Sequence, residues 1–253
     1  MKKIYALALC ATALANTVQA QDENPSKSMY FNKEGKIREF YLTSGGDGML
    51  FSLGKMQQVN SGVTNNDWSN VRFSWWLNIG EHVHYNFTNN IGLYSGLELR
   101  NIGYNFHHMK TVTLQNTNPP ATQEREFVTR RRTYNLGIPL GLKIGNMRNK
   151  NYFFLGGGID LAFAYKEKEW EADNKKNTKT KHSEWFSNEV NLWQPFVFAG
   201  FVVKPGIGIK VSYYPTNYHN QDYTTSSGER KYAGTTVNLF AAGLTMDINN
   251  SKK

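Results

Sequence analysis

The chain has 253 residues and a formal net charge of +9, with 29 Lys and Arg residues against 20 Asp and Glu residues. Its mean hydropathy of -0.56 and the lack of an internal apolar run of about 18 residues exclude a helical membrane protein. The 14% of aromatic residues and the 22 glycines are typical of a strand-rich fold with tight turns.

The N-terminus reads MKKIYALALCATALANTVQAQ and has the three parts of a secretory signal peptide. Two lysines precede a short apolar core, and a small residue, Ala20, precedes Gln21. We predict cleavage between Ala20 and Gln21, with a buried helix or an acylated Cys10 as the alternatives. Cleavage removes the only cysteine, so the mature protein has no disulfide.

The next segment, residues 21–47, is polar and contains Pro25 and the sequence SGGDG. We expect a periplasmic N-terminal tail or linker there, with room for one short strand at residues 37–42. Residues 48–249 form the predicted barrel, and residues 250–253 form a polar C-terminal tail.

Apolar and polar residues alternate in eight runs after residue 47, and a period of two predicts β-strands. Most runs reach the 9–11 residues or so that a membrane strand needs. In one run, 185–203, both faces are apolar, which a β-bulge would explain. The runs cover residues 48–58, 71–85, 91–107, 127–144, 152–166, 185–203, 206–218 and 235–249.

The connections between these runs alternate in length. Those after the second, fourth and sixth runs are short and rich in Asn, Gly and Pro, whereas those after the first, third, fifth and seventh are long and polar. This sorting predicts an all-β fold, an eight-stranded antiparallel up-and-down transmembrane β-barrel with short periplasmic turns and long extracellular loops. A soluble β-sandwich is the alternative, but it gives no reason for sorted loops.

The sequence resembles the small eight-stranded outer-membrane β-barrels, the family that includes the transmembrane part of outer membrane protein A. The resemblance rests on the signal peptide, the strand pattern, the IPLGLKI strand and the last strand. In that strand Gly243, Met246 and Ile248 match the signal for barrel assembly, although Ala241 replaces a polar residue and NNSKK follows. The resemblance implies an outer-membrane location, contact with outer-membrane lipid and lipopolysaccharide, and recognition by the barrel-assembly machinery.

Charged residues recur on the faces that a barrel turns inward. Because an eight-stranded barrel is filled by its own side chains, these charges must be paired. We expect an ion-paired, closed lumen. Its candidate members are Arg72, Glu98, Arg100, Lys143, Asp160, Lys210 and Asp247.

Aromatic residues at the ends of the runs predict girdles at the two membrane boundaries. The candidates near the short turns are Tyr85, Phe87, Tyr152 and Phe153. Those near the long loops are Tyr104, Phe106, Tyr165, Trp170, Trp185, Tyr213 and Tyr214.

Basic residues near the long loops are candidates for lipopolysaccharide. Arg130, Arg131 and Arg132 can hold its phosphates through charge-assisted hydrogen bonds, with a solvated loop as the equal alternative. The lysines of residues 167–184 share their segment with acids, so we expect a mixed-charge loop there. Nucleic acid is not an expected partner of an exported barrel, while a protein or host-surface ligand at the loops stays open.

No nucleotide-binding or zinc motif occurs in the sequence, and we expect no cofactor. His82 and His84 share a face but lack a third ligand, so we expect no metal there. The main interpretation is a non-enzymatic barrel that presents loops for envelope stability or binding. The alternatives are a lipid A-modifying enzyme using His107 or His108, and a narrow channel for small solutes.

Overall fold

The computed structural model describes residues 39–60, 63–74, 78–114 and 121–249. No helix in this part of the chain is long and apolar enough to cross a membrane. Eight strands form a ring, namely β1 (Glu39–Asn60), β4 (Ile79–Asn86), β5 (Ile91–Leu114), β6 (Ala121–Asn146), β7 (Asn151–Glu171), β9 (Trp193–Val203), β10 (Ile207–Tyr214) and β11 (Thr235–Asn249). Three short strands add to it, namely β2 (Val63–Trp68), β3 (Arg72–Ser74) and β8 (Thr180–Trp185).

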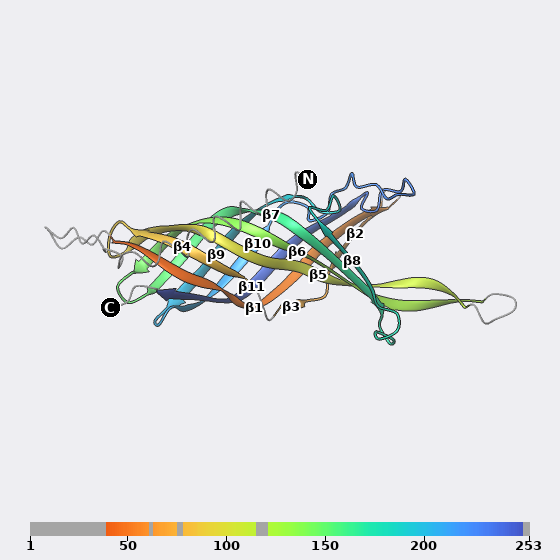
Figure 1. Ribbon diagram of the computed structural model, residues 1–253, viewed down its shortest axis with the longest axis horizontal. Coiled ribbons are helices and arrows are strands. Elements are labelled where there is room, and N and C mark those ends of the chain that lie inside the picture. The colour runs from red at the N-terminus through yellow and green to blue at the C-terminus, as the bar shows by residue number, and fades with distance from the viewer. Residues whose placement is uncertain (1–38, 61–62, 75–77, 115–120, 250–253) are drawn as a thin grey trace.

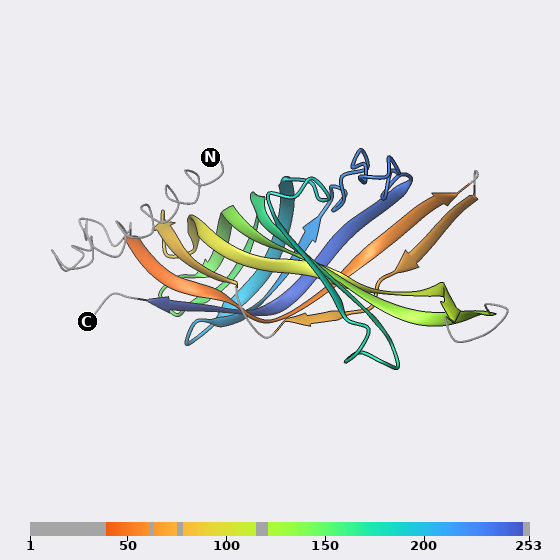
Figure 2. The same ribbon diagram turned by 45° about the vertical axis from the view of Figure 1, so that its right-hand side comes forward.

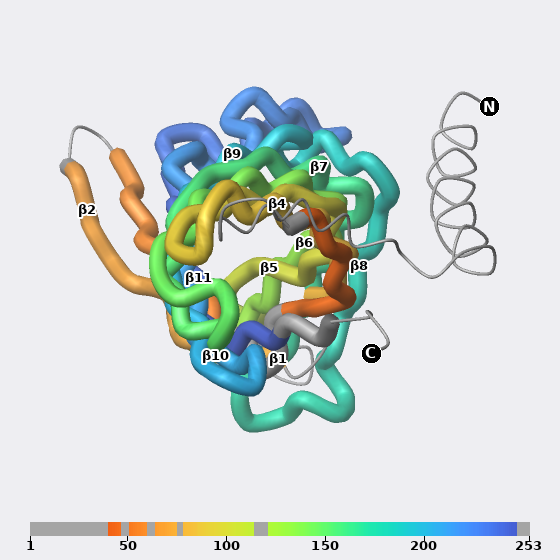
Figure 3. Tube along the Cα trace, turned by 90° about the vertical axis from the view of Figure 1, so that its left-hand side faces the viewer, coloured from red at the N-terminus to blue at the C-terminus, as the bar shows by residue number. Residues whose placement is uncertain are grey.

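The ring strands follow one another in chain order, and each pairs antiparallel with its neighbours. The ring closes where β11 pairs with β1, from Thr43 opposite Asn249 to Gln58 opposite Thr235. Figure 3 shows the closed ring from its end. The fold is therefore the predicted eight-stranded up-and-down barrel, and closure leaves its strands without the free edges that an open sheet exposes.

The barrel is apolar outside and polar inside. On β7 the outward Phe153 and Leu155 are 68% and 51% exposed, whereas the inward Asp160 is fully buried. On β6 the outward face is apolar from Tyr134 to Ile144. These eleven positions extend about 34 Å along a strand, or about 26 Å across a bilayer at a tilt of about 40°. That height matches the apolar band of a membrane barrel, so the outward residues face lipid.

The two ends of the barrel differ. Tight turns connect β4 to β5, β6 to β7 and β9 to β10, and the start of β1 and the end of β11 lie at the same end as these turns (Figure 1). The β5–β6 hairpin and β2 extend far beyond the barrel at the other end (Figure 2). This arrangement places both ends of the barrel on the short-turn side, as the even strand number predicts.

Strand β1 begins at Glu39, earlier than the predicted start at residue 48. The segment 39–46 pairs with β4. Its side chains alternate between the two faces, since Phe40 and Leu42 are exposed and Thr43 is buried. The glycines of SGGDG suggested a linker. They lie instead in a strand, because Gly46 packs directly against the backbone of Asn78, where a side chain has no room.

Three of the four predicted long loops contain β-structure. β5 and β6 pair as far as Leu114 and Ala121, β2 pairs with β1, and β8 pairs with β7. These segments are polar on both faces because they lie beyond the lipid, where neither face is buried in an apolar environment. The alternation that identifies a membrane strand is therefore absent, and sequence reasoning took them for loops.

The run 185–203 does not contain the bulge that its sequence suggested. β8 ends at Trp185, a turn follows, and β9 pairs with β7 and β10 without a register shift. Both faces of β9 are apolar because Phe196 and Phe198 fill the lumen while Val197 faces lipid. Register shifts occur instead in β1 and between β6 and β7, next to Asn135.

The aromatic girdles are only partly as predicted. At the long-loop boundary Phe163 stacks on Trp185 and Tyr213 stacks on Phe240, both pairs on the lipid face. Four of the predicted girdle residues are instead buried inside the barrel. They are Tyr104, Tyr152, Tyr165 and Tyr214. Aromatic residues fill this lumen as well as its rim, and composition alone does not separate the two positions.

Candidate functional site

A charged cluster centred on Glu98 lies in the middle of the lumen. The guanidinium of Arg100 donates two hydrogen bonds to Glu98 Oε2, one of them from Nε at 2.5 Å. Lys210 Nζ lies 3.3 Å and His82 Nε2 2.8 Å from Glu98 Oε1. Strands β4, β5 and β10 supply these groups, so a single buried carboxylate connects three strands of the barrel.

A second buried carboxylate, Asp160 on β7, extends this cluster. Arg100 Nη1 lies 3.6 Å from Asp160 Oδ1. Tyr214 donates a hydrogen bond of 2.9 Å and Asn135 one of 3.2 Å to Asp160 Oδ2. The guanidinium of Arg100 also lies 3.8 Å over the ring of Phe196, which covers its apolar face. Four of the seven residues assigned to the network thus lie together, namely Glu98, Arg100, Asp160 and Lys210.

The other three candidates lie elsewhere. Lys143, near the short turns, donates to Asn86 Oδ1 at 2.8 Å and to the hydroxyl of Tyr41 at 3.1 Å. Arg72 donates to the side-chain oxygen of Asn101 at 2.6 Å. The side chain of Asp247 lies outside the described residues. Neutral oxygens thus contact these two buried cations, and the expectation that every lumen cation is paired with an acid stays a prediction.

The lumen holds little free space beside this cluster. A cavity of about 20 Å³ is lined by residues that include His82, His84, Tyr94 and Lys210. This volume accommodates about one water molecule. Aromatic rings of Phe154 and other residues occupy the cross-section around it. Charged and aromatic side chains thus lie together in this part of the lumen.

A second polar cluster closes the outer end of the barrel around Arg131. Arg131 Nε donates to Glu167 Oε2 at 2.8 Å, and its Nη1 donates to the hydroxyl of Tyr104 at 3.1 Å. Burial alone would raise the pKa of the Glu167 carboxyl, but Arg131 and Lys231 outweigh it and lower that pKa to about 2. Burial lowers the pKa of the nearby His219 imidazole well below its usual value, so this histidine is neutral at pH 7.

The residues of the arginine triplet are divided between the two faces of β6. Arg131 points inward, as above, whereas Arg130 and Arg132 lie on the other face of β6, where Arg132 lies over the ring of Tyr134 and Arg130 over that of Trp170. Directly opposite them on β7 lie Lys168 and Lys166, and Lys181 of β8 lies opposite Lys168. We call this set the outer basic surface, and it consists of Arg130, Arg132, Lys166, Lys168 and Lys181.

Acids and bases of the segment KEKEWE also lie on opposite faces of β7. Lys166 and Lys168 point outward, while Glu167, Glu169 and Glu171 pair inward with Arg131, Lys110 and Arg125. The sequence suggested a mixed-charge loop because it alternates in sign. In a strand, an alternation with period two separates the signs completely. The pKa of Lys168 is lowered by partial burial and by Arg132, Lys179 and Lys181, which are all cations.

The two histidines considered for a lipid A-modifying enzyme differ in their contacts. His107 is exposed, and its Nδ1 lies 2.6 Å from Glu126 Oε1. His108 stacks on Phe106, and partial burial lowers its pKa. Within the described residues, no serine hydroxyl forms a hydrogen bond with either imidazole.

Membrane barrels with an even strand number, short turns at one end and a polar interior are found in outer membranes. The chain is a small β-barrel of the outer-membrane type. No family model and no curated protein match it. One matching solved structure is Ail, the attachment invasion locus protein of Yersinia pestis, in complex with the heparin analogue sucrose octasulfate. The two sequences are 11% identical, the match covers 81% of this chain and 99% of that chain, and the TM-score is 0.30. The outer membrane protease OmpT of Escherichia coli matches at 10% identity, 86% of this chain, 99% of that chain and a TM-score of 0.28.

Proposed function

We propose that this protein is a non-enzymatic outer-membrane barrel with a closed lumen, which binds lipopolysaccharide phosphates through its outer basic surface and presents the β5–β6 hairpin outside the cell. The observation that carries this proposal is the separation of charge on β7. All three of its outer acids are paired inward, so the cations on the outward face lack a neighbouring carboxylate on that strand.

The position of this surface fits phosphate groups. The apolar band of β6 ends at Tyr134, and Arg132 is the next residue on the same face toward the long-loop end. The phosphates of an outer leaflet lie at this depth. Like charges directly opposite one another on a sheet repel. Arg130 faces Lys168, and Lys168 faces Lys181, so a bound polyanion would relieve this repulsion. Arg side chains also hold phosphate oxygens in a bidentate geometry.

Lipopolysaccharide binding to the folded barrel tests the proposal. Replacing Arg130 and Arg132 by Gln should weaken the binding of lipid A at least about tenfold, and removing the lipid A phosphates should weaken binding to the natural protein similarly. The double variant K175Q/K176Q is the matched control, because it removes the same charge from the turn after β7. An equal loss of lipid A affinity in the two double variants would show that only the net charge matters, and would contradict specific binding at the outer basic surface.

The closed lumen is tested separately in planar bilayers. The natural protein should show no steady conductance, because the central cluster and the aromatic rings fill the cross-section. Steady single-channel steps from the natural protein would overturn the plug and favour the channel alternative.

The absence of catalysis is tested on lipid A itself. Mass spectrometry of lipid A should give the same acylation pattern from cells with and without the gene. A change in acyl chains that depends on His107 or His108 would instead establish the enzyme alternative.

A further inference from the structure

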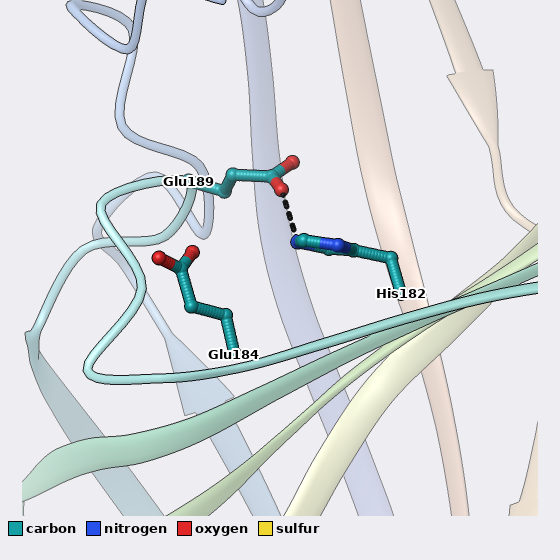
Figure 4. Close-up of side chains that lie close together, drawn as sticks. All are labelled: His182, Glu184 and Glu189. Carbon is teal, nitrogen blue, oxygen red and sulfur yellow. Dashed lines mark ion pairs between the residues drawn. The ribbon is translucent and has the colours of Figure 1, made fainter.

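Three potential metal ligands converge above the outer cluster, on the inward side of β8. His182 and Glu184 project from the same face of β8, and Glu189 faces them from the turn that follows (Figure 4). One ligand atom from each residue lies within 4.8 Å of the others. His182 Nε2 and Glu189 Oε1 are only 3.0 Å apart. This group lies apart from the outer basic surface, because Lys181 points to the opposite face.

The two carboxylates are held in place by further donors. Glu189 is 2% exposed, and its Oε2 accepts hydrogen bonds from Tyr232 at 2.6 Å and Lys231 at 2.7 Å. Ser187 donates a hydrogen bond of 2.6 Å to Glu184 Oε2. One oxygen of each carboxylate is thereby fixed. The Oε1 atoms, of which that of Glu189 contacts His182, are the ones that a metal ion would bind. Outer donors of this kind orient the ligands of metal sites.

The backbone of the turn is also fixed. Phe186 adopts a positive φ of 49°, which turns the chain sharply between Glu184 and Glu189. His219 Nδ1 lies 3.3 Å from the backbone oxygen of Glu189, and the amide of Asn220 donates to the same oxygen at 3.2 Å. The position of Glu189 relative to β8 is therefore set by the fold rather than by its contact with His182.

We propose that His182, Glu184 and Glu189 bind a divalent transition-metal ion of the zinc class at the outer end of the barrel. One imidazole nitrogen and two carboxylate oxygens suit zinc, with water as the fourth ligand, whereas Mg²⁺ and Ca²⁺ favour sites made of oxygen alone. Zinc ligands at about 2.1 Å in a tetrahedron lie about 3.4 Å from one another. His182 and Glu189 are already near this spacing, whereas the Glu184 ligand atom, which lies within 4.8 Å of the other two, must move closer when the ion binds.

The bound ion would join β8 to the turn after it and thereby stabilise the outer closure of the barrel. Such a role is independent of lipopolysaccharide binding, so the two proposals can fail separately. Sequence reasoning missed this group because only His182 and Glu184 are close in sequence, and their spacing of two matches no zinc motif.

Isothermal titration of the tag-free, folded barrel in detergent with zinc chloride tests the proposal. We expect saturable binding of one Zn²⁺ per chain, with at least about tenfold weaker binding of Mg²⁺ and Ca²⁺. The variants H182A and E184Q should each lower the zinc affinity at least about tenfold. X-ray absorption of the zinc-loaded protein should show one imidazole nitrogen and oxygen ligands.

His107→Ala is the matched control, because His107 also pairs with a glutamate, Glu126, and is similarly exposed. Its affinity for zinc should equal that of the natural protein. Heat-modifiable gel migration establishes that each variant is folded, and E184Q carries the test if H182A is not. Absence of saturable zinc binding, or equal affinity in the natural protein, H182A and E184Q, would overturn the proposal.

Discussion

The central carboxylate Glu98 offers the sharpest test of how this barrel is held together. It is 4% exposed and accepts hydrogen bonds or ion pairs from Arg100, Lys210 and His82. Replacing it by Ala removes the carboxylate that these three side chains contact, while Asp160 stays 3.6 Å from Arg100. The variant therefore removes one buried negative charge from the centre of the cluster, while its cations stay buried.

The magnitude follows from the burial of the group. Removing one partner of a buried ion pair costs about 3–5 kcal/mol, because the remaining charge stays desolvated. We expect E98A to lower the free energy of unfolding by about this amount. A second change that removes one cation from the same cluster, Lys210→Met, should restore part of the loss, because it offsets the lost negative charge and puts an apolar side chain of similar length in place of a buried cation.

Urea unfolding of the barrel in lipid vesicles, followed by tryptophan fluorescence, measures these changes. Glu126→Ala is the control, since this carboxylate is also paired with a histidine but has 48% of its side chain exposed. Exposed pairs contribute about 0–1 kcal/mol, so this variant should be nearly neutral. A loss of less than about 1 kcal/mol in E98A, or no recovery in E98A/K210M, would refute the reasoning.

Three further predictions concern other parts of the barrel. The pKa of Glu167 is lowered from its usual 4.5 to about 2, so ionised Glu167 contributes roughly 3 kcal/mol to the free energy of unfolding. This contribution should be complete above pH 4.5 and lost as the pH falls toward 2. Acid unfolding curves should show this dependence in the natural protein and not in E167Q. Gly141→Ala should lower the free energy of unfolding by about 1–3 kcal/mol in the same urea assay, since its Cβ would overlap the ring of Tyr94. Replacing residues 110–125 by a short turn should leave heat-modifiable migration intact, because this hairpin lies beyond the apolar band; loss of the folded band would show that it is required for closure.

Several features of the fold follow from local pattern alone. The alternation of residues 152–166 or 235–249 identifies strands, and the sorted connection lengths identify their up-and-down order. Glu98 and Arg100 share the inward face of one strand, so their burial also follows from period two. The signal peptide with cleavage after Ala20 stays a prediction, since it lies outside the described residues.

Other features depend on which strands lie opposite one another. Arg72 and Lys143 contact neutral oxygens of Asn101, Tyr41 and Asn86, because each cation reaches only the groups within a few ångströms across the lumen. The mixed signs of residues 166–171 separate onto two faces only if that segment is a strand, and its pairing with β6 and β8 decides this. Glu189 meets His182 through a turn whose conformation at Phe186 no sequence motif indicates.

The sequence by itself therefore determined that the chain alternates, how many strands form the ring and which face of most of these strands points inward, because these properties depend on neighbours along the chain. Only the tertiary structure decided the partners of each inward charge, the basic surface across β6, β7 and β8, and the meeting of β8 with the following turn. The charge partners and the basic surface join residues from different strands, so they depend on the register and closure of the whole barrel, whereas the contact of β8 with its turn depends on the conformation of that turn.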